Sequence, residues 1–138
     1  MQITIRRLTS DMAEDYLWYF DTAAFTDHDE WSACYCLESP LSKEENESLT
    51  EKSLRRERAK QLIESGIMQG YLLYDGSKPV GWCNAGDKSG YEPLMTNADY
   101  HTPASCGETI KSVYCFEIAP GYRGKGIAHL LLTRIIDD

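Results

Sequence analysis

The sequence predicts an α/β protein in which helices pack on a mixed β-sheet. Three observations favour this class. Residues 2–8 alternate in the manner of a half-buried strand, and residues 70–85 read as two strands joined by a turn. Between Val113 and Leu132 a further strand, a glycine-rich loop and an apolar helix follow one another. Strands and helices are therefore interspersed along the chain, as in α/β folds.

Residues 1–67 supply the first strand and two predicted helices. Thr9-Ser10-Asp11 with Glu14 is a helix-start signal, and apolar residues follow it at helical spacing. Ser42-Lys-Glu-Glu45 is a second capping signal. It predicts one charged helix that runs through Leu49, Ala59, Leu62 and Ile63, with Gly66 as a left-handed cap.

Residues 70–87 are predicted to form a β-hairpin. Asp75-Gly76 lies between the strands and supplies the positive φ that a tight turn requires. The polar stretch from Gly86 to Thr109 has no sustained periodicity, so we expect a long loop at or near a site. Residues 110–138 then form the last segment of a single domain that covers residues 1–138.

The stretch from Val113 to Leu132 predicts an anion site. Its loop, Tyr122-Arg-Gly-Lys-Gly126, contains two glycines that let the backbone approach a ligand closely. The helix that starts near Gly126 presents unpaired N–H groups and a partial positive charge, which favour a pyrophosphate or phosphate ester. The spacing excludes a P-loop, because Lys125 is not followed by Ser or Thr, and a dinucleotide turn, because His129 replaces the third glycine.

The residues Arg123-Gly-Lys-Gly-Ile-Ala128 resemble the Q/R-x-x-G-x-G/A signature of the GCN5-related N-acetyltransferase superfamily, and a strand ending in apolar-x-Pro precedes them as in that family. The resemblance implies an acyl-CoA N-acyltransferase-like fold with three layers, α/β/α. It also implies acetyl-CoA as cosubstrate, with Phe116 to Ile118 running beside the pantetheine arm. The residues implied at the pyrophosphate are Arg123, Gly124, Lys125, Gly126, Ile127 and Ala128.

The same resemblance implies direct attack of an uncharged primary amine on the thioester. The backbone N–H near Ile118 would stabilise the oxyanion, and Glu117 is the nearest carboxylate in sequence that could act as general base. Strand alternation places Glu117 on the face opposite Phe116 and Ile118, where it faces either the substrate or solvent.

Other residues are weaker candidates for the acceptor side. The segment after the first helix forms the acceptor wall in many relatives, although acids in a loop are more often solvated surface. The acidic candidates are Asp27, Asp29 and Glu30, and Glu108 as a second possible base. Packing or surface roles are the more frequent reading for Tyr114, Tyr122 and His129.

The resemblance ends before the family fold does. In that family a fifth strand, another helix and a closing hairpin follow the helix after the signature, whereas this sequence stops at Asp138. The expected fold is therefore C-terminally truncated, with an open sheet edge that a second copy of the chain could cover as a homodimer.

The composition limits the classes of partner that the protein is expected to bind. A net charge of −8 makes nucleic acid an unfavourable partner, and the absence of any long apolar run argues against membrane insertion. Five scattered cysteines form no disulfide framework or zinc pattern, although Cys34 and Cys36 near His28 leave a metal or redox site as a less favoured reading. We expect a cytoplasmic protein without a metal.

Two functions remain open from the sequence. The first is an acetyl-CoA-dependent N-acetyltransferase that acts on a small-molecule or peptide amine. The alternative is a non-catalytic acyl-CoA-binding or regulatory module, or an inactive truncated acetyltransferase. The sequence does not select the acceptor amine.

Overall fold

The computed structural model describes residues 1–87, 89, 91 and 111–138. In this part of the chain, four strands form an antiparallel sheet in the order β1-β2-β3-β4. The strands are β1 (Ile3–Arg7), β2 (Tyr71–Asp75), β3 (Lys78–Asp87) and β4 (Lys111–Ile118). The predicted hairpin is β2 and β3, and Gly76 at its turn adopts φ 61° as the Asp-Gly pair predicts.

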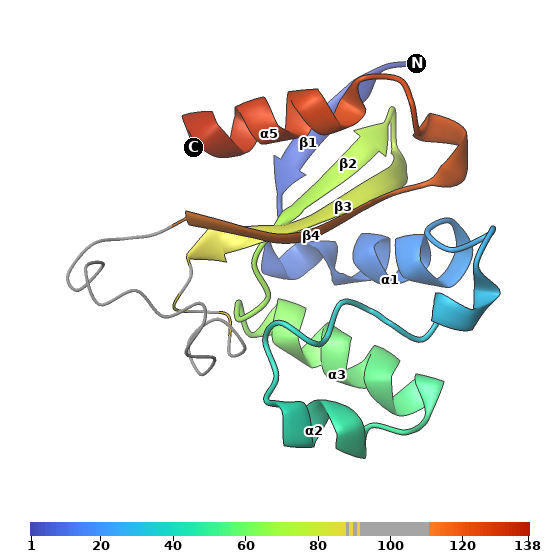
Figure 1. Cartoon of the computed structure of the whole chain (residues 1–138), viewed down its shortest axis with the longest axis vertical. Coiled ribbons are helices and arrows are strands. Elements are labelled where there is room, and N and C mark those ends of the chain that lie inside the picture. Colours follow the sequence, from blue (N-terminus) through green and yellow to red (C-terminus); the bar gives the residue numbers. More distant parts are fainter. Residues whose placement is uncertain (88, 90, 92–110) are drawn as a thin grey trace.

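Helices cover both faces of the sheet. Helices α1 (Ala13–Thr22) and α3 (Lys52–Glu64) lie on one face, with α2 (Lys43–Ser48) beside α3, and α5 (Ile127–Asp137) lies on the other (Figure 1). The short 3-10 turns are η1 (Ser10–Met12), η2 (Asp29–Trp31) and η5 (Pro120–Tyr122). The α/β class and the three-layer arrangement expected from the sequence are confirmed. The described strands all pair antiparallel, so the parallel pairing that the expected mixed sheet requires does not occur among them.

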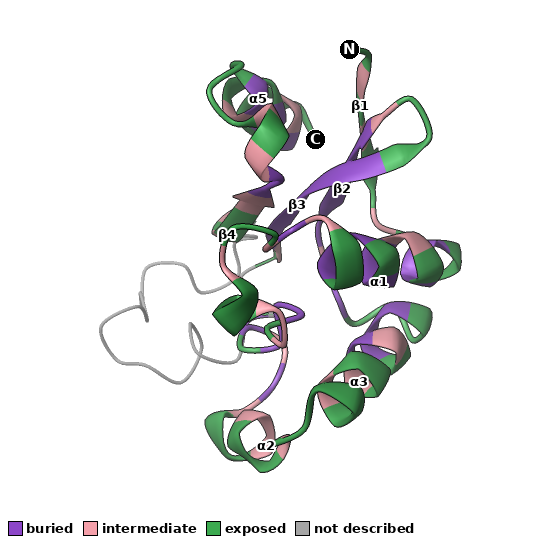
Figure 2. Ribbon diagram, turned by 90° about the vertical axis from the view of Figure 1, so that its right-hand side faces the viewer, coloured by how far each residue is buried: buried purple, intermediate pink, exposed green. Residues whose placement is uncertain are grey.

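Each face of the sheet has its own apolar core. On the α1 side, Trp82 packs edge-on against Tyr16, with the ring centroids 4.9 Å apart. On the α5 side, the helix buries Ile127, Leu131 and Ile135, which recur every four residues and so form one face. Figure 2 shows this division, with buried residues along the strands and on the sheet-facing sides of α1, α3 and α5. The two cores fix α1 and α5 on opposite sides of β4.

The single charged helix predicted after Ser42 is wrong, because the chain forms two helices there. The backbone leaves helical geometry at Leu49 (φ −87°, ψ 79°) and is extended at Glu51 (φ −110°, ψ 143°). Arg55 of α3 donates to the carbonyl oxygen of Asn46, at the end of α2, over 3.2 Å. The same carbonyl accepts from the Leu49 N–H over 3.3 Å, so Arg55 adds a second, charged donor at the end of α2 and ties α3 to it.

The capping predictions at Ser42 and Gly66 agree with the structure. The Glu45 N–H donates to Ser42 Oγ over 3.2 Å at the start of α2. Gly66 has φ 79°, and the N–H groups of Gly66 and Ile67 donate to Ile63 and Leu62. This pair of bonds is the left-handed helix termination that the sequence predicts after Ile63.

The register of β4 determines which of its backbone groups face outward. The Ala119 N–H donates to the Val80 carbonyl over 2.9 Å, and Glu117 lies opposite Trp82. Because paired and unpaired positions alternate in an antiparallel ladder, Phe116 and Ile118 direct their N–H and C=O groups away from β3. Among the described strands, none pairs with that edge of β4.

Candidate functional site

The loop between β4 and α5 exposes a row of backbone N–H groups. Gly124 and Gly126 adopt φ 74° and 77°, and Gly126 is the N-cap of α5. The first N–H that joins the helix is that of Leu130, which donates to Gly126 O over 3.3 Å. In the described residues, no N–H from Gly124 to His129 has an acceptor within the chain.

Both the geometry and the charge of these amides suit the binding of an anion. A Cβ placed on either glycine would meet nothing within 4 Å, so the space beside the loop is open. The N-terminal end of α5 adds a partial positive charge, and Lys125 lies on the exposed loop. The side chain of Ile127 instead packs in the α5-side core, and Ala128 is half-buried, so only their N–H groups are available to a ligand.

The end of β4 places two predicted catalytic positions side by side on opposite faces. Ile118 is buried in the α5-side core, and its N–H points to the open edge of the sheet. Glu117 is on the other face and half-buried, and its carbonyl accepts from the Tyr19 hydroxyl over 2.8 Å. Phe116 is 46% exposed beside them. The edge N–H, the carboxylate and the anion loop thus belong to one continuous segment.

The Arg123 side chain lies against Glu117. Its Nη2 is 2.7 Å from Glu117 Oε1, its Nη1 is 2.7 Å from Asp27 Oδ2, and its Nε donates to the Ile118 carbonyl over 2.8 Å. The guanidinium therefore bridges two carboxylates and the end of β4. The Arg123 side chain is therefore not free to bind the pyrophosphate that the sequence predicts there, and its N–H donates to the Pro120 carbonyl over 3.4 Å.

Opposing effects set the charge state of the two carboxylates. Burial raises the pKa of Glu117, and the Arg123 guanidinium opposes that rise. The hydrogen bond from Arg123 holds the pKa of Asp27 below its ordinary value. A carboxylate with a raised pKa beside an open edge has the properties of a general base.

A shallow pocket of about 300 Å³ adjoins this carboxylate. Its lining residues are His28, Trp31, Phe116, Glu117, Ile118 and Arg123. The His28 and Trp31 rings stack with centroids 4.0 Å apart, and Trp31 is 51% exposed. An exposed aromatic face next to carboxylates is a suitable surface for an amine that carries a positive charge before it reacts.

The other acidic candidates are dispersed around this pocket. Glu30 Oε1 lies 3.1 Å from His28 Nδ1, and Asp29 is exposed. Glu108, the second candidate base, lies outside the described residues, as does most of the predicted 86–109 loop; Gly86 itself belongs to β3. Of the predicted acceptor-wall acids, only Asp27 is joined to Glu117, through Arg123.

The remaining candidates have structural contacts. Tyr122 donates to Asp75 Oδ2 over 2.7 Å, Tyr114 stacks on Tyr91 with the centroids 5.6 Å apart, and His129 is exposed. Cys36 is buried and accepts from Asn84 Nδ2 over 3.1 Å. Within residues 1–87, 89, 91 and 111–138, no group of three His, Cys, Asp or Glu side chains is arranged to hold a metal.

Sequence reasoning missed Tyr19, and it named Asp27 as a candidate without its pairing to Arg123. Tyr19 belongs to α1 and lies 98 positions from Glu117, and Asp27 lies 96 positions from Arg123. Neither pairing leaves a local pattern. The alternation of residues along β4 predicts on which face of the sheet Glu117 lies. It does not predict the contact with Arg123.

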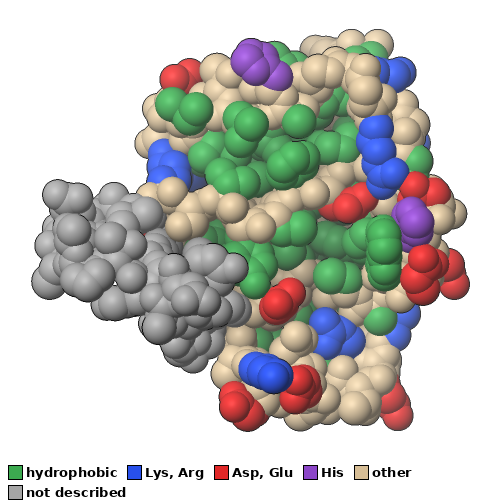
Figure 3. All heavy atoms as spheres, in the orientation of Figure 1, with side chains coloured by type: hydrophobic (Ala, Val, Ile, Leu, Met, Phe, Trp, Pro, Cys, Tyr) green, Lys and Arg blue, Asp and Glu red, His purple; other side chains and the backbone are tan. Residues whose placement is uncertain are grey.

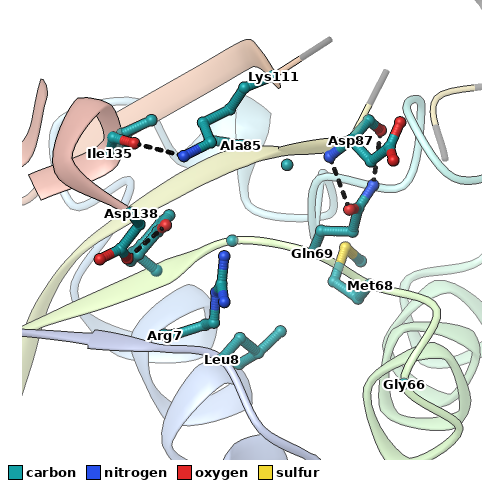
Figure 4. Close-up of a pocket in the computed structure, with 13 residues that line it drawn as sticks. Arg7, Leu8, Gly66, Met68, Gln69, Ala85, Asp87, Lys111, Ile135 and Asp138 are labelled. Atoms are coloured by element: carbon teal, nitrogen blue, oxygen red, sulfur yellow. Dashed lines mark hydrogen bonds between the residues drawn. The ribbon is translucent and has the colours of Figure 1, made fainter. Parts of the chain in front are cut away.

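A pocket of about 490 Å³ at the opposite end of α5 is a weaker candidate (Figure 4). Most of its polar groups already pair with protein atoms, and the Arg7 guanidinium lies over the Tyr71 ring. Lys111 Nζ donates to the Ile135 carbonyl over 2.8 Å, and the Gln69 side chain makes two bonds to the Asp87 backbone, of 3.0 and 2.9 Å. Little remains there to recognise a ligand, so we place the site at the β4–α5 loop.

Apolar side chains gather on the outer surface of β4 and α5 (Figure 3). The large exposed ones on these elements are Val113, Phe116, Leu130, Leu132 and Ile136. They adjoin the edge of β4 that no described strand covers. In the described part of the chain, no helix combines the length and apolar character needed to cross a bilayer.

Comparisons with known proteins agree with this geometry. The model of the acetyltransferase (GNAT) family matches residues 5–138. A ribosomal-protein-alanine N-acetyltransferase from Brucella melitensis biovar Abortus 2308 has a similar structure, with 15% identity and a TM-score of 0.56, over 99% of this chain and 70% of that chain. No curated protein sequence matches the chain.

Two aminoglycoside-modifying enzymes share the fold. An aminoglycoside 6′-N-acetyltransferase from Acinetobacter baumannii is 16% identical, with a TM-score of 0.51, over 99% of this chain and 70% of that chain. An aminoglycoside N-acetyltransferase solved in complex with CoA is 9% identical, with a TM-score of 0.51, over 99% of this chain and 68% of that chain.

Proposed function

Because the chain belongs to the acetyltransferase (GNAT) family, we propose that it transfers an acetyl group from acetyl-CoA to a primary amine. The observation that carries the proposal is the row of free N–H groups from Gly124 to His129 next to the open edge of β4. One segment then holds the diphosphate and places the thioester beside Ile118 and Glu117.

The proposed cofactor contacts follow the backbone. The pyrophosphate accepts hydrogen bonds from the amides of residues 124–128, and Lys125 adds charge at the loop. The pantetheine arm lies along the outward-facing backbone groups of Phe116 and Ile118, in the manner of an added strand. Exposed apolar surface on β4 and α5 would shield the arm from water.

The proposed chemistry is direct acyl transfer. Glu117 takes a proton from the substrate ammonium, and the resulting amine attacks the thioester carbonyl carbon. The Ile118 N–H stabilises the oxygen of the tetrahedral intermediate. The carbon–sulfur bond then breaks, and the CoA thiolate leaves and takes the second proton that the attacking nitrogen loses, so that amide and free thiol are the products; Glu117 returns its proton to solvent.

The acceptor we propose is an amine of a small molecule or a peptide. The net charge of −8 and the carboxylates Asp27, Glu30 and Glu117 around the pocket attract a cation. The similar structures include enzymes named for an alanine of a ribosomal protein and for aminoglycosides, both of which present amines.

Calorimetry and a turnover assay test the proposal together. We expect heat of binding with CoA and thermal protection of the folded protein, and thiol release from acetyl-CoA in the presence of at least one member of an amine panel. Binding without turnover on any amine would instead assign a non-catalytic CoA-binding module. No binding of CoA by folded protein would contradict both.

We also propose that the chain acts in the cytoplasm, with its cysteines reduced, and forms a homodimer through the Val113 part of the open edge of β4, which leaves the backbone of Phe116 and Ile118 to pantetheine. The support is the exposed apolar group that includes Val113, Phe116 and Leu130 beside that edge. Sedimentation equilibrium is expected to give twice the chain mass, and a Val113→Lys variant to shift the protein toward the monomer. A monomer at all accessible concentrations would contradict the dimer.

A further inference from the structure

The Arg123 side chain makes more contacts with β4 than its place in the phosphate loop requires. Its three donor groups each have an acceptor: Asp27, Glu117 and the Ile118 carbonyl. The side-chain exposure is 42% for Arg123, 36% for Asp27 and 23% for Glu117, so the guanidinium is partly withdrawn from solvent at its Glu117 end. A planar fork that meets two carboxylates at 2.7 Å fixes the orientation of both.

We propose that Arg123, anchored by Asp27, is the positioning residue for Glu117 and keeps its carboxylate ionised and aimed at the acceptor pocket. This inference rests on the proposed function for the role of Glu117 as base. It assigns the Arg123 side chain to the acceptor side of the reaction, while its backbone stays in the cofactor loop. Binding of the cofactor and orientation of the base are thereby joined in one residue.

Arg123 and Asp27 shift the pKa of Glu117 in opposite directions. The guanidinium favours the ionised carboxylate, whereas the Asp27 carboxylate disfavours it and offsets part of the Arg123 charge. The other titratable groups that face Glu117 in the described residues are Tyr19 on α1, Cys115 on β4 and His28. Of these, His28 is the one that can become positive, and it acts in the same direction as Arg123.

The test is a titration of Glu117 in three variants. Carbon-detected NMR of glutamate-labelled protein reports the carboxyl group directly, and Glu117→Gln identifies its resonance. We expect Arg123→Gln to raise the pKa of Glu117 by on the order of one unit and Asp27→Asn to lower it, since an opposite charge at this distance shifts a carboxyl by one to three units. Arg123→Lys retains the charge and is expected to restore most of the shift.

Kinetics carried out on the same variants separate positioning from cofactor binding. The acid limb of kcat/KM is expected to move with the NMR titration, toward higher pH in Arg123→Gln and lower pH in Asp27→Asn, while the KM for acetyl-CoA stays within about threefold. Arg123→Gln that raises the KM for acetyl-CoA and leaves the Glu117 titration in place would overturn the inference, because the side chain would then serve the phosphate.

The NMR titration does not need a substrate, so the two proposals fail separately. Opposite shifts of Glu117 in a protein that turns over no amine would support the control of Glu117 by Arg123 and contradict the acetyltransferase proposal. Shifts in the same direction for Arg123→Gln and Asp27→Asn would overturn the inference even in an active enzyme.

Discussion

At the scale of single residues, Glu117 has the features that a general base requires. Burial raises its pKa, and Arg123 and Tyr19 fix its side chain and its carbonyl. The raised pKa brings the carboxylate closer in basicity to the ammonium it must deprotonate. The position is also adjacent to the Ile118 N–H, so base and oxyanion donor are held by one peptide unit.

Glu117→Gln should therefore lower kcat/KM by about 100-fold or more, the usual contribution of general base catalysis. In the native protein the rate should fall as pH drops through the pKa of Glu117, because only the ionised form accepts a proton, and the variant should lose this limb. Asp29→Asn removes an exposed acid that is not among the partners of Arg123 and serves as the charge-matched control. Equal losses in both variants would assign the effect to overall charge.

Gly126 is the residue on which the anion loop depends most directly. Its φ of 77° costs an L-residue about 1 kcal/mol or more, and a methyl group there would project into the open space beside the amides. We expect Gly126→Ala to weaken CoA binding at least tenfold by calorimetry. Gly121→Ala is the matched control, because Gly121 has no positive φ and no atom within 4 Å of an added Cβ; its binding should be unchanged.

At the scale of elements, one side chain of α3, Arg55, connects the two helices at the break with the segment that precedes them. Arg55 donates to the carbonyls of Ala33, Cys34 and Asn46, over 2.6, 3.1 and 3.2 Å. These bonds tie α3 to the end of α2 and to the segment that follows Trp31 of the acceptor pocket. The helix pair thus supports the wall of the pocket from behind.

Arg55→Ala is expected to lower the free energy of unfolding by about 2 kcal/mol, since it removes several hydrogen bonds from a charged donor, including the one to the Ala33 carbonyl. Arg56→Ala is the neighbouring control. Arg56 pairs with Asp21 at the surface over 3.0 Å, and such pairs contribute about 1 kcal/mol or less. Urea unfolding monitored by tryptophan fluorescence measures both, and an equal loss would refute the specific role of Arg55.

At the scale of the whole molecule, local sequence patterns predict the strands, turns and helix starts, whereas contacts between distant residues determine the site. The β2–β3 hairpin, the start of α5 at Gly126 and the face of Glu117 follow from periodicity and glycine positions, and the structure agrees with each. The split of α2 from α3 and the Asp27–Arg123 pair depend on residues 22 and 96 positions apart. Such contacts appear only once the layers are packed, so the sequence could not indicate them.

The buried phenols and thiols set the alkaline limit of the folded chain. Burial raises the pKa of Tyr16 and Tyr19 above the ordinary value of about 10, and that of Cys83 to about 12. A group with a higher pKa in the folded state contributes stability that is complete below its unfolded pKa and is lost as pH rises. The free energy of unfolding is therefore expected to decline from about pH 9 upward.

Tyr19→Phe tests this expectation, because it removes an ionisable hydroxyl and keeps the ring. At neutral pH the variant should lose about 1 kcal/mol, since the Glu117 carbonyl loses a donor. Between about pH 9 and 11 its urea midpoint should decline less steeply than that of the native protein. The pKa of Tyr122 is also raised, chiefly by its hydrogen bond to Asp75 rather than by burial, so Tyr122→Phe should flatten the slope less than Tyr19→Phe. A native midpoint that stays constant over this range would mean that the phenols ionise as readily in the folded chain as in the unfolded one.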